Sequence, residues 1–199
     1  MSSAATPLHA VAFNCTLKGS RGKEKSSTEV LLQQLLESLE SHGVTSEIIR
    51  AVDHNILPGV EHDEGRGDDW PKLLKRLLAA DIVILGTPIW LGQSCSVAKR
   101  VLERMDAFLS ETDERGRMPS FGKVALAGIV GNEDGAHHIT ATVFQALNDV
   151  GWTIPAGAAD YWVGEAMQKK DFKDRSRCPS RWRRAPPCSP PMLSTWRLC

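Results

Sequence analysis

The sequence has no apolar run long enough to cross a membrane, and its start does not resemble a secretory signal peptide. Met1–Leu8 lacks a basic region, and the apolar run LHAVAFN that begins at Leu8 is too short for a signal-peptide core. The five cysteines form no CxxC pair, which favours reduced thiols over a disulfide framework. These absences predict a cytoplasmic protein without a membrane partner.

The sequence also lacks a net charge, so its composition gives no reason to expect nucleic acid as a partner. The charges are nevertheless unevenly distributed. Residues 1–174 hold all 24 acidic residues against 18 basic ones, whereas residues 175–199 hold six arginines and no acid. A length of 199 residues suits one domain with a full core. We therefore expect one domain over 1–174 and a separate, atypical tail over 175–199.

Short apolar runs alternate with amphipathic segments along the chain, and no internal repeat is visible. The apolar runs predict strands, and the amphipathic segments, with apolar residues every three or four positions, predict helices. The strands are expected at 8–14, 44–50, 81–86, 122–130 and 152–163, the last interrupted by Pro155 and Gly157. The helices are expected at 28–43, 68–81, 94–110 and 135–151. This alternation indicates a three-layer α/β/α sandwich with a five-stranded parallel sheet.

Three loops follow the predicted first, third and fourth strands, at 14–28, 86–94 and 131–136. They would meet at one edge of a parallel sheet, where ligands bind in folds of this kind. The first loop is rich in hydroxyl and lysine side chains and runs directly into a helix, a combination that suits a phosphate group. Taken alone, it is also compatible with a solvated loop and an ordinary Ser or Thr cap at residues 26–28.

The other two loops differ in character. The loop GTPIWLGQS places Ile89, Trp90 and Leu91 directly after a buried strand, so either the protein itself covers them or a flat apolar ligand lies against them. The loop GNEDGA has two glycines around three polar residues. It could line a second wall of the same site, or form a plain turn capped by Asp134.

Several common site motifs are missing. No GxGxxG follows the first strand, GSRGKEKSS lacks the GxxxxGK[ST] pattern, and GQSCS lacks the closing glycine of GxSxG. Cys15 and Cys95 are expected to be small packing residues, and one of His137 and His138 to be packed and the other exposed. The polar loop 51–68 contains Asp53, His54, Glu61, His62 and Asp63, whose spacing matches no fixed ligand pattern. We therefore predict a solvated acidic loop there and no metal site.

Three parts of the chain together resemble the flavodoxin-like NAD(P)H-dependent FMN reductase and quinone reductase family. They are FNCTLKGS with SSTEVLLQQLLE, then ADIVILGTPIWLGQSCSVAKRVLERMDAF, and then GKVALAGIVGNEDGAHH with ALNDVGWTIP and ADYWVG. The second part is the most specific, and the resemblance covers about residues 8–170. The T-x-T-G-x-T phosphate loop of electron-carrier flavodoxins is missing.

The resemblance implies a flavodoxin-like fold and a set of FMN-binding residues. Those implied around the FMN phosphate are Thr16, Lys18, Ser26, Ser27 and Thr28. Those implied along the isoalloxazine ring are Pro88, Ile89, Trp90, Leu91 and Gly92. Those implied to close its other side are Gly131, Asn132, Glu133, Asp134 and Gly135.

The resemblance also implies hydride transfer from NAD(P)H to FMN and on to a small acceptor, such as a quinone, free flavin or azo compound. The flavin carries this chemistry, so no side chain is assigned a catalytic role. A homodimer or homotetramer is implied as well. Two other functions stay open: a non-enzymatic FMN-binding electron carrier or redox sensor, and an interaction protein that has lost the cofactor.

Residues 175–199 depart from the pattern where a fifth amphipathic helix is due. These residues contain five prolines, three cysteines and six arginines, and a proline inside a helix costs about 3 kcal/mol. The segment is either a disordered basic extension or the product of a frameshift near residue 174. The abrupt change in composition favours the frameshift.

Overall fold

The protein folds around one central parallel sheet in the computed structural model, which describes residues 6–22, 24–167 and 170–174. The parallel strands are β1 (His9–Asn14), β2 (Thr45–Arg50), β3 (Ile82–Trp90), β5 (Val124–Gly131) and β6 (Ala159–Val163). Their order across the sheet is β2-β1-β3-β5-β6, and a two-residue strand, β4 (Gln93–Ser94), pairs antiparallel with β3. The predicted five-stranded parallel sheet is confirmed, with β4 as an addition. The predicted tail 175–199 lies outside the described residues.

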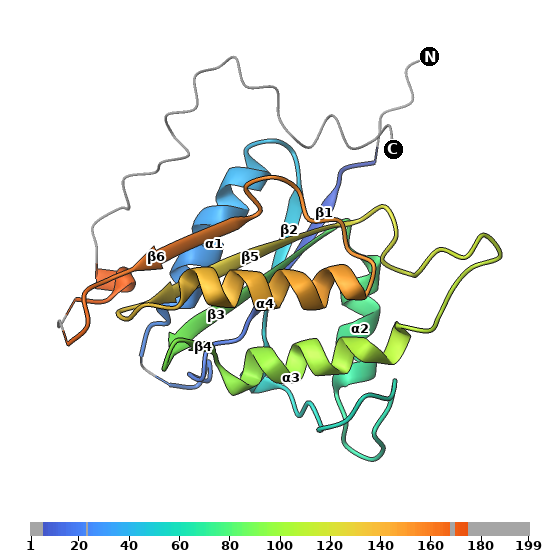
Figure 1. The fold of residues 1–199 in the computed structure, drawn as a ribbon, viewed down its shortest axis with the longest axis horizontal. Coiled ribbons are helices and arrows are strands. Elements are labelled where there is room, and N and C mark those ends of the chain that lie inside the picture. Colours follow the sequence, from blue (N-terminus) through green and yellow to red (C-terminus); the bar gives the residue numbers. More distant parts are fainter. Residues whose placement is uncertain (1–5, 23, 168–169, 175–199) are drawn as a thin grey trace.

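Helices cover both faces of the sheet, as predicted (Figure 1). They are α1 (Ser27–Glu40), α2 (Trp70–Ala79), α3 (Ser96–Met105) and α4 (Ala136–Asp149). Side chains of a strand point alternately to the two faces. Ala10 and Ala12 of β1 therefore pack on the side of α1, whereas Val11 and Phe13 pack on the side of α2, α3 and α4. No helix of the described residues is long and apolar enough to span a membrane.

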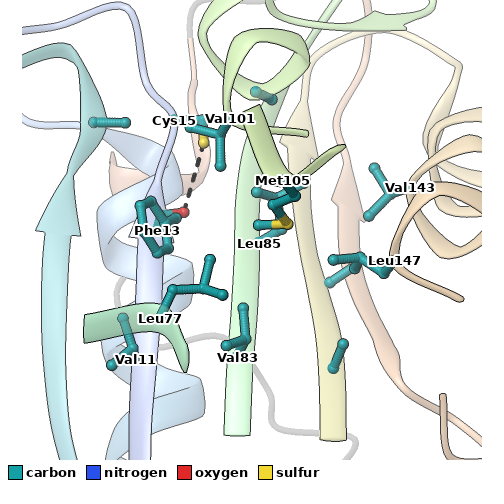
Figure 2. Close-up of a cluster of buried hydrophobic side chains, with 14 of the residues drawn as sticks. Val11, Phe13, Cys15, Leu77, Val83, Leu85, Val101, Met105, Val143 and Leu147 are labelled. Atoms are coloured by element: carbon teal, nitrogen blue, oxygen red, sulfur yellow. Dashed lines mark hydrogen bonds between the residues drawn. The ribbon is translucent and has the colours of Figure 1, made fainter. Parts of the chain in front are cut away.

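The larger part of the core lies between the sheet and the three helices α2, α3 and α4. Figure 2 shows part of this cluster, with the labelled side chains Val11, Phe13, Cys15, Leu77, Val83, Leu85, Val101, Met105, Val143 and Leu147. Full burial of an aliphatic side chain stabilises a fold by about 1.5–3 kcal/mol before entropy is subtracted. This packing holds the strands in fixed positions, so the loops at their carboxyl ends start from a rigid edge.

The last strand and the loop after β3 differ in extent from the prediction. The expected interruption of 152–163 at Pro155 and Gly157 is present, and only Ala159–Val163 forms β6, while Thr153 makes an isolated bridge to Val124. The predicted loop 86–94 is largely strand, because β3 continues to Trp90 and turns directly into β4.

The polar loop before α2 is anchored by a buried ion pair. Asp68 and Arg104 lie 2.8 Å apart with neither side chain exposed. Arg104 also donates to the carbonyls of Leu57 and Glu61, both at 2.8 Å. The prediction of a simply solvated loop over 51–68 is therefore incomplete. Within the described ranges, no group of three or more His, Cys, Asp or Glu side chains could hold a metal ion.

Candidate functional site

A cavity of about 420 Å³ lies at the carboxyl ends of β1, β3 and β5. All three predicted segments contribute to its wall, because parallel strands bring their carboxyl ends to one edge. The predicted residues that line it are Thr16, Lys18, Ser27, Thr28, Pro88, Ile89, Trp90, Gly131, Asn132 and Glu133. Its volume is in the range of small-molecule and cofactor sites, about 300–1,000 Å³.

The other five predicted residues lie beside the cavity and shape its wall. Ser26 is the buried N-cap of α1, and its Oγ accepts a hydrogen bond from the Glu29 amide at 3.2 Å. Leu91 and Gly92 form the turn between β3 and β4. Asp134 and Gly135 belong to the loop that leads into α4.

The β3–β4 hairpin replaces the predicted loop. Ile89 pairs with Ser94 and Trp90 with Gln93, which leaves Leu91 and Gly92 as a two-residue turn. Both turn residues have positive φ, 51° and 73°, as the tight turns of hairpins require. The hairpin presents Trp90 to the cavity with 53% of its surface exposed.

The first turn of the β1–α1 loop is held by its own polar groups. Asn14, buried at the end of β1, accepts a hydrogen bond from the Thr16 amide at 3.1 Å. Thr16 Oγ1 in turn accepts from the Lys18 amide at 3.3 Å. These contacts direct Thr16 and Lys18 toward the N-terminal end of α1, where the first N–H groups of a helix have no partner within the helix.

Residues at the end of β2 hold the same loop from outside. Arg50 donates to the Lys18 carbonyl at 3.0 Å and pairs with Glu29 in the first turn of α1. Asp53 accepts from the Ser20 amide at 2.9 Å. Hydrogen bonding from the Ser20 side chain, with help from this amide, lowers the pKa of Asp53. The sequence does not reveal these clamps, because both residues come from a segment more than thirty positions away.

Sequence reasoning also missed a group of residues on the cavity wall. They are Leu17, Val130, Trp162, Ala166, Met167 and Asp171. Trp162 packs on Phe172, with ring centroids 5.6 Å apart. The sequence did contain a signal for Trp162. A large aromatic side chain near the end of a strand usually packs against another group. Nothing in the sequence marks Asp171.

Asp171 is the centre of a polar cluster at the cavity. Its Oδ1 accepts from Asn132 Nδ2 at 2.8 Å, and its Oδ2 lies 3.0 Å from Lys173 Nζ. The Lys173 ammonium, with smaller help from Asn132 and Lys18, holds the pKa of Asp171 below its ordinary value. The carboxylate is therefore charged at neutral pH.

Cys15 and Cys95 lie buried behind the cavity wall. Cys95 Sγ donates to the Cys15 carbonyl at 2.7 Å, and burial, together with Cys95, raises the pKa of the Cys15 thiol well above its usual value. The burial of both side chains fits the packing role predicted for them. The prediction for His137 and His138 is half wrong, because both are exposed. They contact Tyr161 and Gln93 respectively.

The two ends of the cavity fit a flat, phosphorylated ring compound. One end has the hydroxyls of Thr16, Ser27 and Thr28, the Lys18 side chain and the positive end of the α1 dipole, all suited to a phosphate. The rest of the wall is mainly apolar and includes two tryptophans, Trp90 and Trp162. The chemistry of the wall therefore matches FMN, whose phosphate and isoalloxazine ring need these two surroundings.

The strand order β2-β1-β3-β5-β6 and a cavity at the carboxyl edge define a flavodoxin-like α/β protein. Within that class, residues 10–167 match the NADPH-dependent FMN reductase family, and the chain belongs to it. The resemblance read from the sequence is confirmed. FMN and NAD(P)H are the cofactors of this family of flavoprotein oxidoreductases.

Individual relatives add detail. The chain is 34% identical over 168 residues to 8-demethyl-8-aminoriboflavin-5'-phosphate synthase of Streptomyces davaonensis, which covers 80% of this chain and 65% of that protein. It is 41% identical over 172 residues to the divalent metal cation transporter MntH of Mycobacterium bovis, covering 84% of this chain and 25% of the transporter. The chain thus spans less than two thirds of either relative.

One solved structure is similar to the chain in both fold and sequence. RosB with the bound intermediate 8-demethyl-8-formylriboflavin-5'-phosphate superposes with a TM-score of 0.76 at 32% identity. The match covers 85% of this chain and 71% of RosB.

Proposed function

We propose that the protein is an FMN-dependent NAD(P)H oxidoreductase that passes hydride from the nicotinamide to FMN and on to a small acceptor, such as a quinone or free flavin. One observation carries the proposal. A hydroxyl-lined helix N-terminus and an apolar, tryptophan-bearing wall meet in one cavity at the carboxyl edge of the sheet. Family membership supports the oxidoreductase class.

At the phosphate end, hydroxyl groups and free amides of the first turn of α1 would donate hydrogen bonds to the phosphate. Thr16, Ser27 and Thr28 supply the hydroxyls, and Lys18 supplies a positive charge. Donors on a loop and a helix end are costly to order, so their preorganisation matters. Arg50 contributes by holding the Lys18 carbonyl in place.

At the ring end, the mainly apolar wall would hold the isoalloxazine ring. Pro88, Ile89 and Trp90 come from β3, Gly131 ends β5, and Asn132 and Glu133 follow in the next loop. Bound FMN would supply the two-electron chemistry at this place. Trp90 is half-exposed, so nicotinamide and acceptor can reach the cavity in turn.

The test begins with the visible absorption spectrum of the purified protein, before and after incubation with FMN and desalting. We expect retained flavin bands, followed by NAD(P)H oxidation that depends on a quinone acceptor. Retained FMN with only slow oxidation of NAD(P)H would favour the electron carrier or redox sensor instead. Protein that never retains flavin, with a folded circular dichroism spectrum, would reject both and favour an interaction protein.

A second candidate function treats the flavin phosphate as the substrate. It is favoured by the similarity to 8-demethyl-8-aminoriboflavin-5'-phosphate synthase and to RosB, whose structure contains a modified riboflavin phosphate. The two candidates differ in what happens to the flavin. Mass spectrometry of the flavin recovered after turnover separates them, since an oxidoreductase returns FMN with its mass unchanged.

We also propose that the protein works as a homodimer or homotetramer. Trp90 and Leu91 support this, because they expose 53% and 91% of their surface on one hairpin beside the cavity. Light scattering after size-exclusion chromatography tests it directly. A monomer at micromolar concentration would contradict the proposal.

A further inference from the structure

We propose that Lys173 is a second phosphate-binding lysine of the cavity, brought there by the segment that follows β6, and that Asp171 is the residue that positions it. The inference rests on the proposed function, because it takes the phosphate of FMN to lie at the end of the cavity formed by Thr16, Lys18, Ser27 and Thr28.

Residues 170–174 are packed against the start of α1. Phe172 is 2% exposed and forms a small apolar cluster with Leu31 of α1 and Val130 of β5. The Lys173 amide donates to Ser27 Oγ at 3.3 Å. The backbone at Lys173 is therefore fixed next to the first residue of α1, on the side where that helix offers its free amides.

The Lys173 side chain is held at the cavity by Asp171. Lys173 Nζ lies 3.0 Å from Asp171 Oδ2 and the side chain is 19% exposed. The other carboxylate oxygen, Oδ1, is occupied by Asn132 Nδ2 at 2.8 Å. Asp171 and Asn132 both line the cavity. An ammonium group has three donors, so Lys173 can bind Asp171 and still offer donors to a ligand.

Lys18 approaches the same place from the opposite loop. Its Nζ lies 2.9 Å from Glu24 Oε2. Lys18 and Lys173 both lower the pKa values of the Glu24 and Asp171 carboxylates. Lys18 is the main cause of the lowered pKa of Glu24 and Lys173 adds to it, while Lys173 is the main cause of the lowered pKa of Asp171 and Lys18 adds to it. Asp174 also acts on Lys173. The two ammonium groups of Lys18 and Lys173 thus lie among three carboxylates, and Lys18 and Asp171 line the cavity.

This arrangement is suited to a dianion. Glu24 pairs with Lys18 and Asp171 with Lys173, so each of these carboxylates has its ion pair with a different lysine. A phosphate ester carries a charge of about −1.5 to −2 and three acceptor oxygens, so it can accept from both lysines and from the helix amides together. Charge-assisted bonds of this kind are the strong ones.

The experiment compares FMN with riboflavin, which differ only in the phosphate. Their dissociation constants are measured by quenching of flavin fluorescence with the full chain. For Lys173→Gln we expect the constant for FMN to rise about tenfold or more, as for loss of one charge-assisted bond, and that for riboflavin to stay within about twofold. Lys170→Gln, at an exposed lysine of the same segment, is the matched control and should change neither.

Further variants separate a ligand contact from a structural role. Lys173→Arg keeps the charge and should restore most of the preference for FMN. Asp171→Asn should weaken FMN binding less than Lys173→Gln does. If Asp171 acts through Lys173, the double variant should bind FMN as weakly as Lys173→Gln alone.

Three results would overturn the inference. Lys173→Gln could weaken FMN and riboflavin equally, which is the signature of a misplaced segment, or it could change neither. Full additivity of Asp171→Asn with Lys173→Gln would remove the positioning role. A wild-type protein that binds FMN no better than riboflavin would instead refute the phosphate end itself, and one that binds neither would refute the proposed function.

Discussion

Glu133 ties the loop after β5 to the hairpin turn after β3, because its Oε1 accepts a hydrogen bond from the Leu91 amide at 3.1 Å. Leu91 has a φ of 51°, a backbone conformation that residues other than glycine rarely adopt. Glu133 therefore helps to hold a strained turn in place beside Trp90. The two loops form one unit of the cavity wall.

We expect Glu133→Ala to raise the dissociation constant of FMN several-fold, since the turn loses its partner and Trp90 is no longer held. Glu133→Gln keeps an oxygen acceptor and should have a clearly smaller effect. Fluorescence titration of both variants is the measurement. Equal losses in both variants would show that the charge of Glu133, and not its hold on Leu91, matters.

The approach of Gly135 to Gly92 predicts a large loss of stability on Gly135→Ala. A Cβ at Gly135 would lie 2.7 Å from Gly92 Cα, and the φ of 137° is unfavourable for alanine. We expect a loss of about 2–4 kcal/mol in the free energy of unfolding, measured in urea. Gly116→Ala is the control, since Gly116 has a φ of 72° and open space around it, and it should lose only about 1–2 kcal/mol. If both variants lose the same free energy of unfolding, the close contact with Gly92 does not destabilise Gly135→Ala.

The ion pair between Asp68 and Arg104 predicts a pH-dependent contribution to stability. Asp68→Asn leaves Arg104 buried without its counter-charge, and we expect a loss of about 3–5 kcal/mol at pH 7. Burial by itself raises the pKa of Asp68, but the amides of Glu64, Trp70 and Leu57 and the Arg104 guanidinium lower it overall. The ionised carboxylate therefore stabilises the fold above the ordinary carboxyl range, and this contribution is lost as the pH falls through the lowered pKa.

Urea unfolding of wild type and Asp68→Asn at several pH values measures this contribution. The difference between the two proteins should be constant near neutral pH and should narrow below about pH 4. Asp113→Asn is the control, because Arg117 lowers the pKa of Asp113 to about 2 at an exposed position, where ion pairs contribute little. A difference that stays the same down to pH 2 would contradict the role of the Asp68 charge.

Trp90 should act on the ring of the flavin and not on its phosphate. Trp90→Ala is expected to raise the dissociation constants of FMN and riboflavin by the same factor, about five- to tenfold for a lost aromatic contact. Trp90→Phe should keep most of the affinity. A change confined to FMN would place the phosphate, and not the ring, beside Trp90.

The fold class could be predicted because it depends on local periodicity. Leu31, Leu32 and Leu36 mark the buried face of α1, and DIVILG marks the start of the central strand. Alternation of strands and helices then restricts the connections to right-handed crossovers. The convergence of three loops follows from the same rule, since all the parallel strands end at one edge.

The end of β3 could not be predicted from its residues. Thr87 and Pro88 are typical of a turn, yet they continue the strand because Pro88 still pairs with Val130 of β5. The pairing of β1 with β3 ends at Gly86, so Pro88 lies where β3 has one neighbour of the main sheet. A proline is tolerated there, since no bond of the ladder on the other side is lost.

The sequence by itself determined the order of strands and helices, the parallel sheet and the three segments that meet at its edge, because these depend on patterns within a few residues. Only the tertiary structure decided which side chains meet. Asp171 reaches Asn132 across 39 positions, Arg104 reaches Asp68 across 36, and Lys173 reaches Ser27 across 146. Contacts of this kind depend on how distant segments pack against each other, and no local pattern of residues encodes that packing.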